Sequence, residues 1–240
     1  MIRRPRRPRG PEPVYVKPFN PLDYANLTKN VVEELMRQPA APLPLERAFI
    51  GAGVYALFYI GADPDYAPFR SPEADVPIYV GKAAPAGARK GVATNLVTKT
   101  ELYKRLSEHT ASINAAENLS LEDFRCRYLV VEPLWIAMAE SFLITNFKPL
   151  WNLKLDGFGN HNPGKGRFQG EIPLWDVHHP GRPWVKNFKQ GRTREDSLKA
   201  IAEFTRIQRE RPDLLALMAE DAAAAEAGTD GTAESPESDV

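Results

Sequence analysis

The amino-acid sequence predicts an α/β domain with extensions at both ends. Three short runs rich in β-branched and aromatic residues have the composition of strands, and four longer stretches have the composition of helices. At 240 residues and 43% hydrophobic content, the chain can bury one substantial core and carry additional arms.

Both ends of the chain have biased compositions. Residues 1–20 form a basic Arg/Pro arm with five arginines among the first nine residues. Its prolines exclude a helix, so we expect an extended segment suited to lie along a phosphate backbone. Residues 21–190 are the predicted catalytic body, followed by a helical extension over 191–220. Residues 221–240 are predicted to fray from a short helix into an acidic disordered tail.

The first half of the body contains two predicted strands. A helix over 24–38 ends at the proline-rich stretch 39–44, and strands follow at 52–60 and 77–81. Residues 61–76, between the two strands, have the composition of a loop and contain three prolines.

A helix is next predicted over 98–118, because Thr98 and Glu101 have the spacing of a capping box. The third strand, 124–131, contains the single cysteine, Cys126, for which a small buried thiol is the simplest interpretation.

The rest of the chain, after the third predicted strand, differs from the first part in composition. Pro133 is suited to the first turn of a very apolar helix over 134–147. From 149 to 184 the sequence is rich in Gly, Pro, His and Trp without a clear period, which predicts ordered loops held by aromatic packing. A further helix is predicted over 194–208.

The net charge of zero conceals a basic body. Every Lys and Arg lies at or before Arg211, whereas eight acidic residues follow it. Residues 1–212 therefore carry 31 basic and 23 acidic side chains, a net charge of +8. Such a body suits a polyanionic partner, because neutralised phosphates release counterions. A basic surface that serves only solubility is the alternative, with about equal weight on charge alone.

Several classes of protein are excluded. One cysteine is too few for a disulfide scaffold or a Cys-rich zinc site. No run approaches the ~18 apolar residues of a membrane span, and the basic arm lacks the apolar core of a signal peptide. We therefore expect a cytoplasmic protein with no membrane partner.

Two tyrosines on the first two predicted strands each lie close to a glycine. The two tripeptides are Gly53-Val54-Tyr55 and Tyr79-Val80-Gly81, the second followed by Lys82. A tyrosine in a strand usually serves packing, so either tripeptide alone is a weak signal.

Two further features are unusual. Arg105 and His109 are spaced i,i+4 on the second predicted helix, which places them on one face, although such pairs more often form a solvated surface. Glu140 stands in the middle of an apolar helix. A buried carboxylate costs free energy unless it is paired or holds a metal, so Glu140 is the most informative single residue.

The order of these residues resembles the GIY-YIG nuclease superfamily, and within it the type II restriction endonucleases with an Arg-x-x-x-His helix. The likeness covers about 50–155 for the catalytic core and extends to about Trp184. Valine replaces isoleucine in both tripeptides, and the connection 61–76 is longer than the family's usual one, which suggests dimer or DNA contacts. The resemblance implies a three-stranded antiparallel sheet flanked by helices, whose face gathers Tyr55, Tyr79, Arg105, His109, Glu140 and Asn152.

These residue types suit phosphodiester hydrolysis. Glu140 is the core carboxylate suited to hold Mg²⁺, one ion per active site. Arg105 would neutralise the pentacovalent phosphorane. Tyr55 would take the proton of the attacking water, with His109 assisting and Lys82 supplying positive charge. Whether Tyr55 or His109 is the final acceptor is left open.

Two roles are subsidiary. Tyr79 is expected to hydrogen-bond the attacking water or a phosphate oxygen. Asn152 is expected to orient Glu140 or the water shell of the metal.

The candidates for reading DNA bases lie on glycine-rich loops after the core and are Arg167, Gln169 and Arg182. The alternative is a loop packed by tryptophans, with solvated basic groups. The histidines at 161, 178 and 179 lack the accompanying carboxylates or cysteines of a zinc site.

The sequence thus predicts a Mg²⁺-dependent type II restriction endonuclease that cuts double-stranded DNA as a homodimer, at a palindromic GC-rich site for which the resemblance indicates CCGCGG. Two alternatives stay open: a nicking repair or homing nuclease of the same superfamily, and a non-catalytic DNA-binding module on the same fold. A DNA methyltransferase would be a functional partner, not a physical one.

Overall fold

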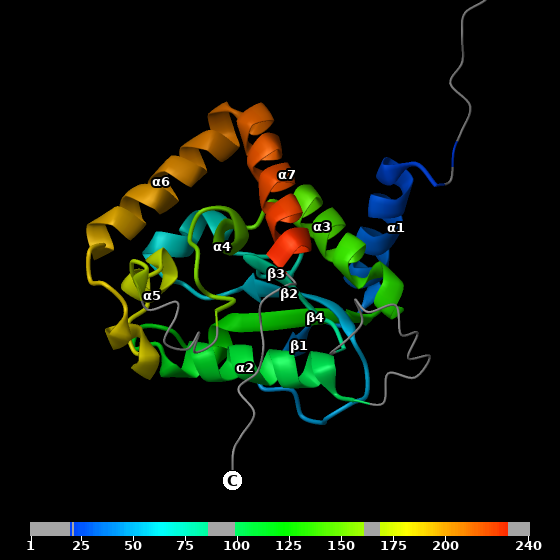
Figure 1. Cartoon of the computed structure of the whole chain (residues 1–240), viewed down its shortest axis with the longest axis horizontal. Helices are drawn as coiled ribbons and strands as arrows, with labels where there is room; N and C mark the ends of the chain where they lie inside the picture. Colours follow the sequence, from blue (N-terminus) through cyan, green and yellow to red (C-terminus); the bar gives the residue numbers. More distant parts are fainter. Residues whose placement is uncertain (1–19, 21, 86–98, 161–168, 230–240) are drawn as a thin grey trace, which may run out of the picture.

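The protein folds around a four-stranded antiparallel sheet with helices on both faces (Figure 1). The computed structural model describes residue 20 and residues 22–85, 99–160 and 169–229, without the side chains of 227–229. The strand order is β1-β4-β2-β3, with β1 Ala41–Pro42, β2 Gly53–Tyr59, β3 Tyr79–Ala83 and β4 Phe124–Val130. The predicted α/β fold is therefore confirmed.

The sheet has one strand more than the three expected. Ala41 and Pro42 pair with Cys126 and Arg125 along the outer edge of β4, inside a stretch that was predicted only to end the first helix. Proline is tolerated there because the strand lies at the edge of the sheet. A strand of two residues is too short to be found from composition.

Strand β2 separates two hydrophobic clusters. Tyr55, Leu57 and Tyr59 pack in the cluster that contains Leu102, Leu106 and Ile113 of α2 (Glu101–Ala115). Val54, Ala56 and Phe58 pack in the cluster that contains Ile136, Ala139, Leu143 and Ile144 of α3 (Ile136–Phe147). Successive side chains of a strand point to opposite faces, so a strand covered on both sides is apolar throughout. All seven residues of β2 are buried accordingly.

Helix α3 is itself covered by two other helices. Helix α1 (Tyr24–Arg37) and helix α7 (Pro212–Thr229) both contact α3, on the side of the sheet away from α2 (Figure 1). The bounds of α1 agree with the predicted helix to one residue.

The start of α2 differs from the prediction. The helix begins at Glu101 with Thr100 as its N-cap, and the Thr100 side chain makes no capping hydrogen bond. The expected capping box opened the helix three residues earlier, at Thr98, which lies outside the described residues. Asn118 lies beyond the helix, which ends at Ala115.

The described parts of the segment from 149 to 184, residues 149–160 and 169–184, are held by aromatic packing, as expected, but they also form short helices that the sequence did not indicate. These are α4 Leu150–Leu153, α5 Leu174–His178 and the 3-10 turn Pro183–Asn187. Trp151, Phe158 and Trp175 pack against one another with ring centroids 4.6 to 5.7 Å apart.

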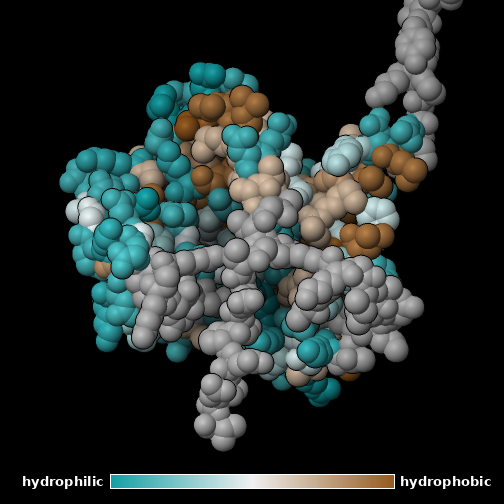
Figure 2. Space-filling view, in the orientation of Figure 1, coloured by the Kyte–Doolittle hydropathy of each residue, from teal (hydrophilic) through white to brown (hydrophobic). Residues whose placement is uncertain are grey.

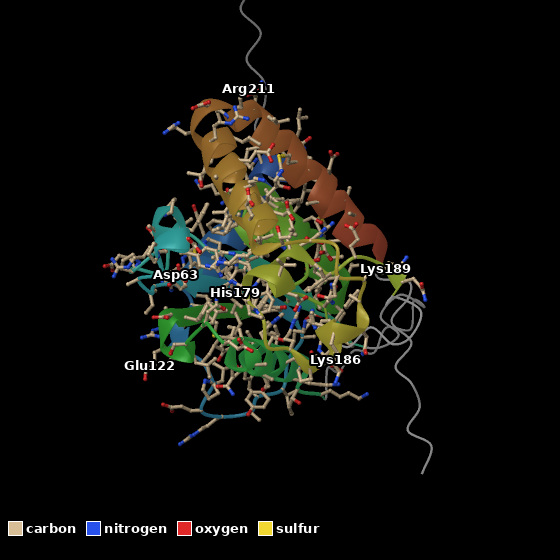
Figure 3. The ribbon with its side chains drawn as sticks, turned by 90° about the vertical axis from the view of Figure 1, so that its left-hand side faces the viewer. Asp63, Glu122, His179, Lys186, Lys189 and Arg211 are labelled. Carbon is tan, nitrogen blue, oxygen red and sulfur yellow. The ribbon has the colours of Figure 1, made fainter. Side chains whose placement is uncertain are left out.

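The loop between β2 and β3 contributes to the same packing. It forms the 3-10 helix Pro64–Phe69, whose Tyr66 is fully buried. The Tyr66 hydroxyl lies 2.5 Å from Nε2 of His179 and accepts a hydrogen bond from Trp151. Nδ1 of His179 donates in turn to Asn118, which leaves Nε2 to accept the Tyr66 proton. Figure 3 shows His179 well inside this side of the molecule, while Asp63, Glu122 and Lys186 lie nearer its edges. The long connection therefore has a structural role.

The C-terminal part of the chain is more ordered than predicted. Helix α6 (Arg194–Glu210) is capped by the reciprocal hydrogen bonds of Thr193 and Asp196, and its outer surface is largely hydrophilic (Figure 2). Residues 221–229, where a short helix fraying into an acidic tail was expected, continue helix α7, and Ala222 and Ala223 pack in the cluster that contains α3. The alanine-rich sequence favours a helix, and the apolar contacts of these two residues with α3 hold it in place.

Some predictions fall outside the described residues. These concern the basic arm up to residue 19, His161, Arg167 and residues 230–240. Within the described part of the chain, no helix combines the length and the apolar character needed to cross a membrane.

Candidate active site

The candidate residues meet around the free edge of strand β3. Tyr79 packs on the α2 side of the sheet, whereas Lys82, three residues on, lies on the α3 side beside Glu140. Odd and even positions of a strand face opposite ways, so only an edge strand can join groups from the two faces in one cavity. That cavity has a volume of about 200 Å³ and is lined by Tyr79, Lys82, Ala84, Arg105, Glu140 and Glu226.

Tyr55, His109 and Arg105 form a hydrogen-bonded group on the α2 side. The Tyr55 hydroxyl lies 2.5 Å from Nε2 of His109, and Nε of Arg105 donates to the same hydroxyl over 3.3 Å. Arg105 donates to the phenol oxygen, and the phenol donates its own proton to His109 in the tautomer in which Nε2 of His109 is unprotonated. The i,i+4 spacing that placed Arg105 and His109 on one helical face thus brings both to Tyr55.

The glycines of the two tripeptides make room for this group. Tyr55 pairs with Gly81 across the sheet, and a Cβ on Gly81 would lie 2.3 Å from the Tyr55 hydroxyl oxygen. A Cβ on Gly53 would lie 2.0 Å from the carbonyl oxygen of Leu129. Neither contact is tolerable, so both positions require glycine.

Two residues that the sequence did not single out complete the surroundings of His109. The Phe158 ring stacks on His109 with centroids 4.5 Å apart and packs edge-on against Tyr79 at 4.9 Å. The carbonyl of the next residue, Gly159, accepts a hydrogen bond of 2.9 Å from Arg105. The glycines that flank Phe158 were the available signal, since they mark a tight loop.

Burial makes both tyrosines weak acids. It raises the pKa of Tyr55 to about 12, although the positive charge of Arg105 acts in the opposite direction. The pKa of Tyr79 is also raised well above its ordinary value by burial, and the negative forms of its neighbours add to this. Neither phenol is ionised near neutral pH.

Glu140 is buried in the middle of α3 with 4% of its surface exposed, and Lys82 Nζ lies 2.7 Å from its Oε2. Burial raises the pKa of Glu140 to about 7, and the Lys82 charge limits the rise. The expectation that this carboxylate requires a cationic partner is met by Lys82. The same nitrogen donates to the backbone carbonyl of Glu226 over 3.0 Å.

Asn152 does not contact Glu140 through any hydrogen bond of the described structure. Its amide holds the backbone of strand β3 instead, because Oδ1 accepts from the N–H of Val80 at 2.8 Å and Nδ2 donates to the Val80 carbonyl at 2.9 Å. Asn152 thereby completes the unpaired edge of β3 and fixes the strand that carries Tyr79 and Lys82. The role predicted for it, orienting Glu140 or the water shell of the metal, stays a prediction beside this structural one.

Arg182 was a candidate for reading bases, and the structure corrects this interpretation. It is 4% exposed, and its five N–H donors bind Asp176 twice and the carbonyls of residues 157, 158 and 160. Its guanidinium also lies over the rings of Trp175 and Trp184, at 4.6 and 4.3 Å. No donor is left for a base. Gln169, in contrast, is exposed.

His178 and His179 are both buried and hydrogen-bonded within the protein. Nδ1 of His178 lies 2.9 Å from the hydroxyl of Ser197, and His179 is held by Tyr66 and Asn118. The described residues include no group of three or more His, Cys, Asp or Glu side chains arranged to hold a metal ion.

Comparison with known proteins supports the sequence resemblance. A family model described as the Eco29kI GIY-YIG domain matches residues 47–205, which is well over half of the chain. A comparison with curated protein sequences finds no match. The matched span contains the six positions predicted for the site, from Tyr55 to Asn152, together with Lys82. The chain therefore belongs to the Eco29kI GIY-YIG domain family of restriction endonucleases.

Proposed function

We propose that this protein is a type II site-specific endonuclease that hydrolyses both strands of double-stranded DNA with Mg²⁺. The observation that carries the proposal is the contact between Tyr55 and His109, with Arg105 on the same hydroxyl and the Glu140–Lys82 pair across the edge of β3. A nucleophile-activating group, a fixed positive charge and a carboxylate suited to a hard cation are the elements that phosphodiester hydrolysis needs.

The proton of the attacking water would pass through Tyr55 to His109. With a pKa of about 12, the Tyr55 phenol is ionised in only about one molecule in 10⁵ at neutral pH, so a preformed phenolate is not the working base. A concerted transfer avoids this difficulty: the phenol oxygen accepts the proton of the water while its own proton moves to Nε2 of His109. In the same step the water oxygen would bond to phosphorus, the bond from phosphorus to the 3′ oxygen would break, and the departing 3′ oxygen would take a proton from solvent.

Arg105 and Tyr79 would act on the phosphate. Both line the cavity, and the Arg105 guanidinium is held by Tyr55 and Gly159, so its charge is already in position. A positioned cation stabilises the extra negative charge of the phosphorane without reorganisation. The Tyr79 hydroxyl is suited to hydrogen-bond a phosphate oxygen or the attacking water.

Glu140 would hold the Mg²⁺ ion, one per active site. The donor set fits, because Mg²⁺ is bound in proteins through one or two carboxylates with water and substrate oxygens completing the shell. Burial supplies a second reason, since a carboxylate with a raised pKa is stabilised by a nearby cation. When bound, the ion supplies Lewis acid chemistry at the phosphate and the departing oxygen. Lys82 would then supply further positive charge beside the phosphate.

We further propose a homodimer that acts on a palindrome, because a two-fold axis presents the same active site to both strands. By resemblance to the restriction branch, CCGCGG is the first site to try. Gln169 is exposed and stays a candidate for base contact, as does Arg167. A companion DNA methyltransferase would protect host DNA.

The test is digestion of plasmid and phage DNA by the purified full chain with Mg²⁺. We expect discrete fragments whose ends map to CCGCGG, and no cutting of a matched plasmid in which one base pair of that site is changed. A ladder of diffuse products, nicks in one strand, or no cutting with any divalent cation would count against the proposal. Sedimentation of the uncleaved complex, with Ca²⁺ in place of Mg²⁺, measures whether two copies bind one duplex.

A further inference from the structure

Helix α7 reaches the catalytic cavity from outside the matched family span. The family model ends at residue 205, whereas α7 covers Pro212–Thr229. Near the C-terminal end of α7, the Glu226 side chain lines the cavity together with Arg105 and Glu140, and the Glu226 carbonyl binds Lys82 Nζ at 3.0 Å. The helix therefore contacts a cation that the proposed reaction uses.

The end of α7 that faces the cavity is negative. The helix contains Asp213, Glu220, Asp221 and Glu226 and no Lys or Arg. Glu226 belongs to the last turn, where backbone carbonyls have no partner within the helix and the helix dipole is negative. The Glu226 carbonyl oxygen is thus bound to Lys82, and Glu226 lines the cavity that Arg105 also lines. Lys82 and Arg105 are the groups that a DNA phosphate would contact. The Glu226 charge also raises the pKa of both Tyr79 and Glu140.

The two halves of α7 are attached differently. Leu215 and Ala219 are buried in the first half, and Leu214 and Met218 pack against the main core. Among the side chains that the structure describes in the second half, Ala223 is buried and Ala222 is partly buried beside it. An alanine buries less apolar surface than the leucines of the first half, so these side chains contribute less apolar stabilisation than those of the first half.

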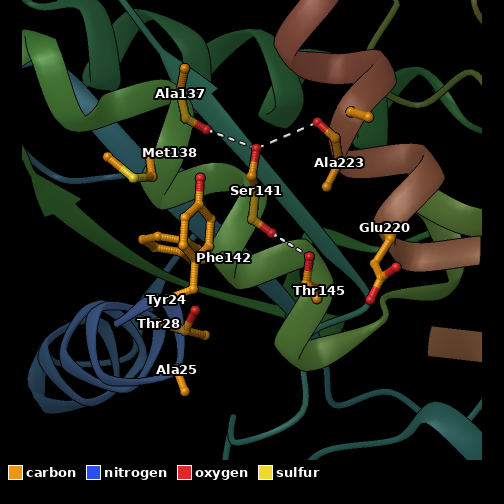
Figure 4. Close-up of a pocket in the computed structure, with 11 residues that line it drawn as sticks. Tyr24, Ala25, Thr28, Ala137, Met138, Ser141, Phe142, Thr145, Glu220 and Ala223 are labelled. Carbon is orange, nitrogen blue, oxygen red and sulfur yellow. Dashed lines mark hydrogen bonds between the residues drawn. The ribbon is translucent and has the colours of Figure 1, made fainter. Parts of the chain in front are cut away.

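The second half of α7 meets α3 along a seam around Ala223, and the polar contact along this seam is also weak. Ser141 Oγ lies 3.4 Å from the Ala223 carbonyl, while it donates at 3.0 Å to Ala137 within its own helix (Figure 4). Beyond the seam, a groove of about 700 Å³ separates α7 from α1, with Tyr24, Phe142 and Ala224 among its lining residues (Figure 4). The second half of α7 is thus supported mainly on the α3 side, and the adjoining groove gives it room to move.

We infer that the C-terminal half of α7 is an autoinhibitory strap, which occupies the phosphate-binding side of the active site and is displaced when DNA binds. The inference rests on the proposed function, because it assigns the displaced contacts to a DNA phosphate. Lys82 exchanges the Glu226 carbonyl for a phosphate oxygen, and removal of Glu226 from the cavity opens the side on which Arg105 would meet the scissile group. The apparent DNA affinity equals the affinity of the molecules with a displaced strap multiplied by the fraction of molecules in that state.

Two full-length variants test the strap. Ala223→Asp places a charge in the buried seam, and Ala224→Asp places the same charge at the neighbouring exposed position. We expect Ala223→Asp to bind a CCGCGG duplex about tenfold more tightly in Ca²⁺, and to cut it faster at low DNA concentration in Mg²⁺. Ala224→Asp should stay within about twofold of the parent chain. Equal affinities for all three proteins would overturn the inference.

Hydrogen exchange of the unmodified chain gives a second test that needs no substitution. DNA binding should speed exchange of the α7 amides around 223–226 by about tenfold or more, while amides around 214–218 stay protected. If DNA is bound and cut but exchange at 223–226 is unchanged or slower, the strap is wrong and the proposed function stands. If neither the parent nor Ala223→Asp binds DNA, both fail together.

Discussion

The Tyr55 hydroxyl on β2 and Nε2 of His109 on α2 lie 2.5 Å apart, inside the protein and next to the Arg105 guanidinium. Tyr55 is fully buried, and so is His109. A phenol in such a place is held in one geometry and cannot ionise readily, but it can pass a proton to an imidazole nitrogen within hydrogen-bond distance. This contact joins Tyr55 of the first tripeptide to His109 of the helix that also carries Arg105.

Replacing Tyr55 by Phe should lower the rate of DNA cleavage by about 10² to 10⁴, because the proton path to His109 is lost while the ring packing is kept. Single-turnover cleavage measures this, and circular dichroism checks the fold. A Tyr55→Phe variant that cuts at nearly the parent rate would move the role of base to His109.

Activity should depend on pH through Glu140. Its raised pKa of about 7 means that the carboxyl is protonated below that pH and ionised above it. A protonated carboxyl does not ligate a metal, so apparent Mg²⁺ affinity should fall by up to about tenfold per unit as pH drops below about 7. Mg²⁺ titrations of the cleavage rate between about pH 6 and pH 8 measure this dependence. A flat affinity over that range would show that Glu140 is already ionised or is not the ligand.

Replacing Asn152 by Ala should destabilise the protein rather than change its use of metal. The two hydrogen bonds to Val80 are lost, and leaving buried backbone groups unpaired costs about 1 to 3 kcal/mol each. We expect a lower midpoint in thermal unfolding and an unchanged Mg²⁺ concentration for half-maximal rate. A variant of parental stability with weakened Mg²⁺ dependence would restore the role first expected for this residue.

Replacing Arg182 by Lys should also act on stability. Lysine cannot replace the five donors or the planar contact with Trp175 and Trp184. Each buried carbonyl left without its hydrogen bond costs about 1 to 3 kcal/mol. Gln169→Ala, at an exposed position, is the matched change that should leave unfolding unaltered. If Arg182→Lys kept its stability and instead relaxed the preferred cleavage sequence, a base-reading role would be reinstated.

The elements that the sequence predicted well are those with long or strongly patterned segments. The strands around Tyr55 and Phe124, and the helix carrying Glu140, have buried faces that composition and spacing reveal directly. The edge strand Ala41–Pro42 and the short helices after residue 149 are stabilised by tertiary contacts, which leave little local pattern.

Several contacts among the candidate residues were predictable from sequence, but their detailed geometry was not. Spacing brought Arg105 and His109 together, and burial singled out Glu140. The hydrogen bonds of Asn152 to the Val80 backbone depend on the tertiary fold, which places Asn152 beside the free edge of β3. The buried position of Arg182 depends on two tryptophans and Asp176 that are distributed around it. Glu226 could not be linked to the cavity from sequence, because the packing of its short predicted helix beside β3 depends on the tertiary fold.

Cleavage by a Glu140→Gln variant tests the central claim most directly. The amide keeps the size of the side chain but removes the negative charge that would hold Mg²⁺ and that now pairs with Lys82. We predict a loss of cleavage of about 10³-fold or more, since a catalytic metal contributes several kcal/mol, with duplex binding in Ca²⁺ within about tenfold of the parent chain. A folded Glu140→Gln protein that cuts DNA at the parent rate would contradict the assignment of this site as the active site.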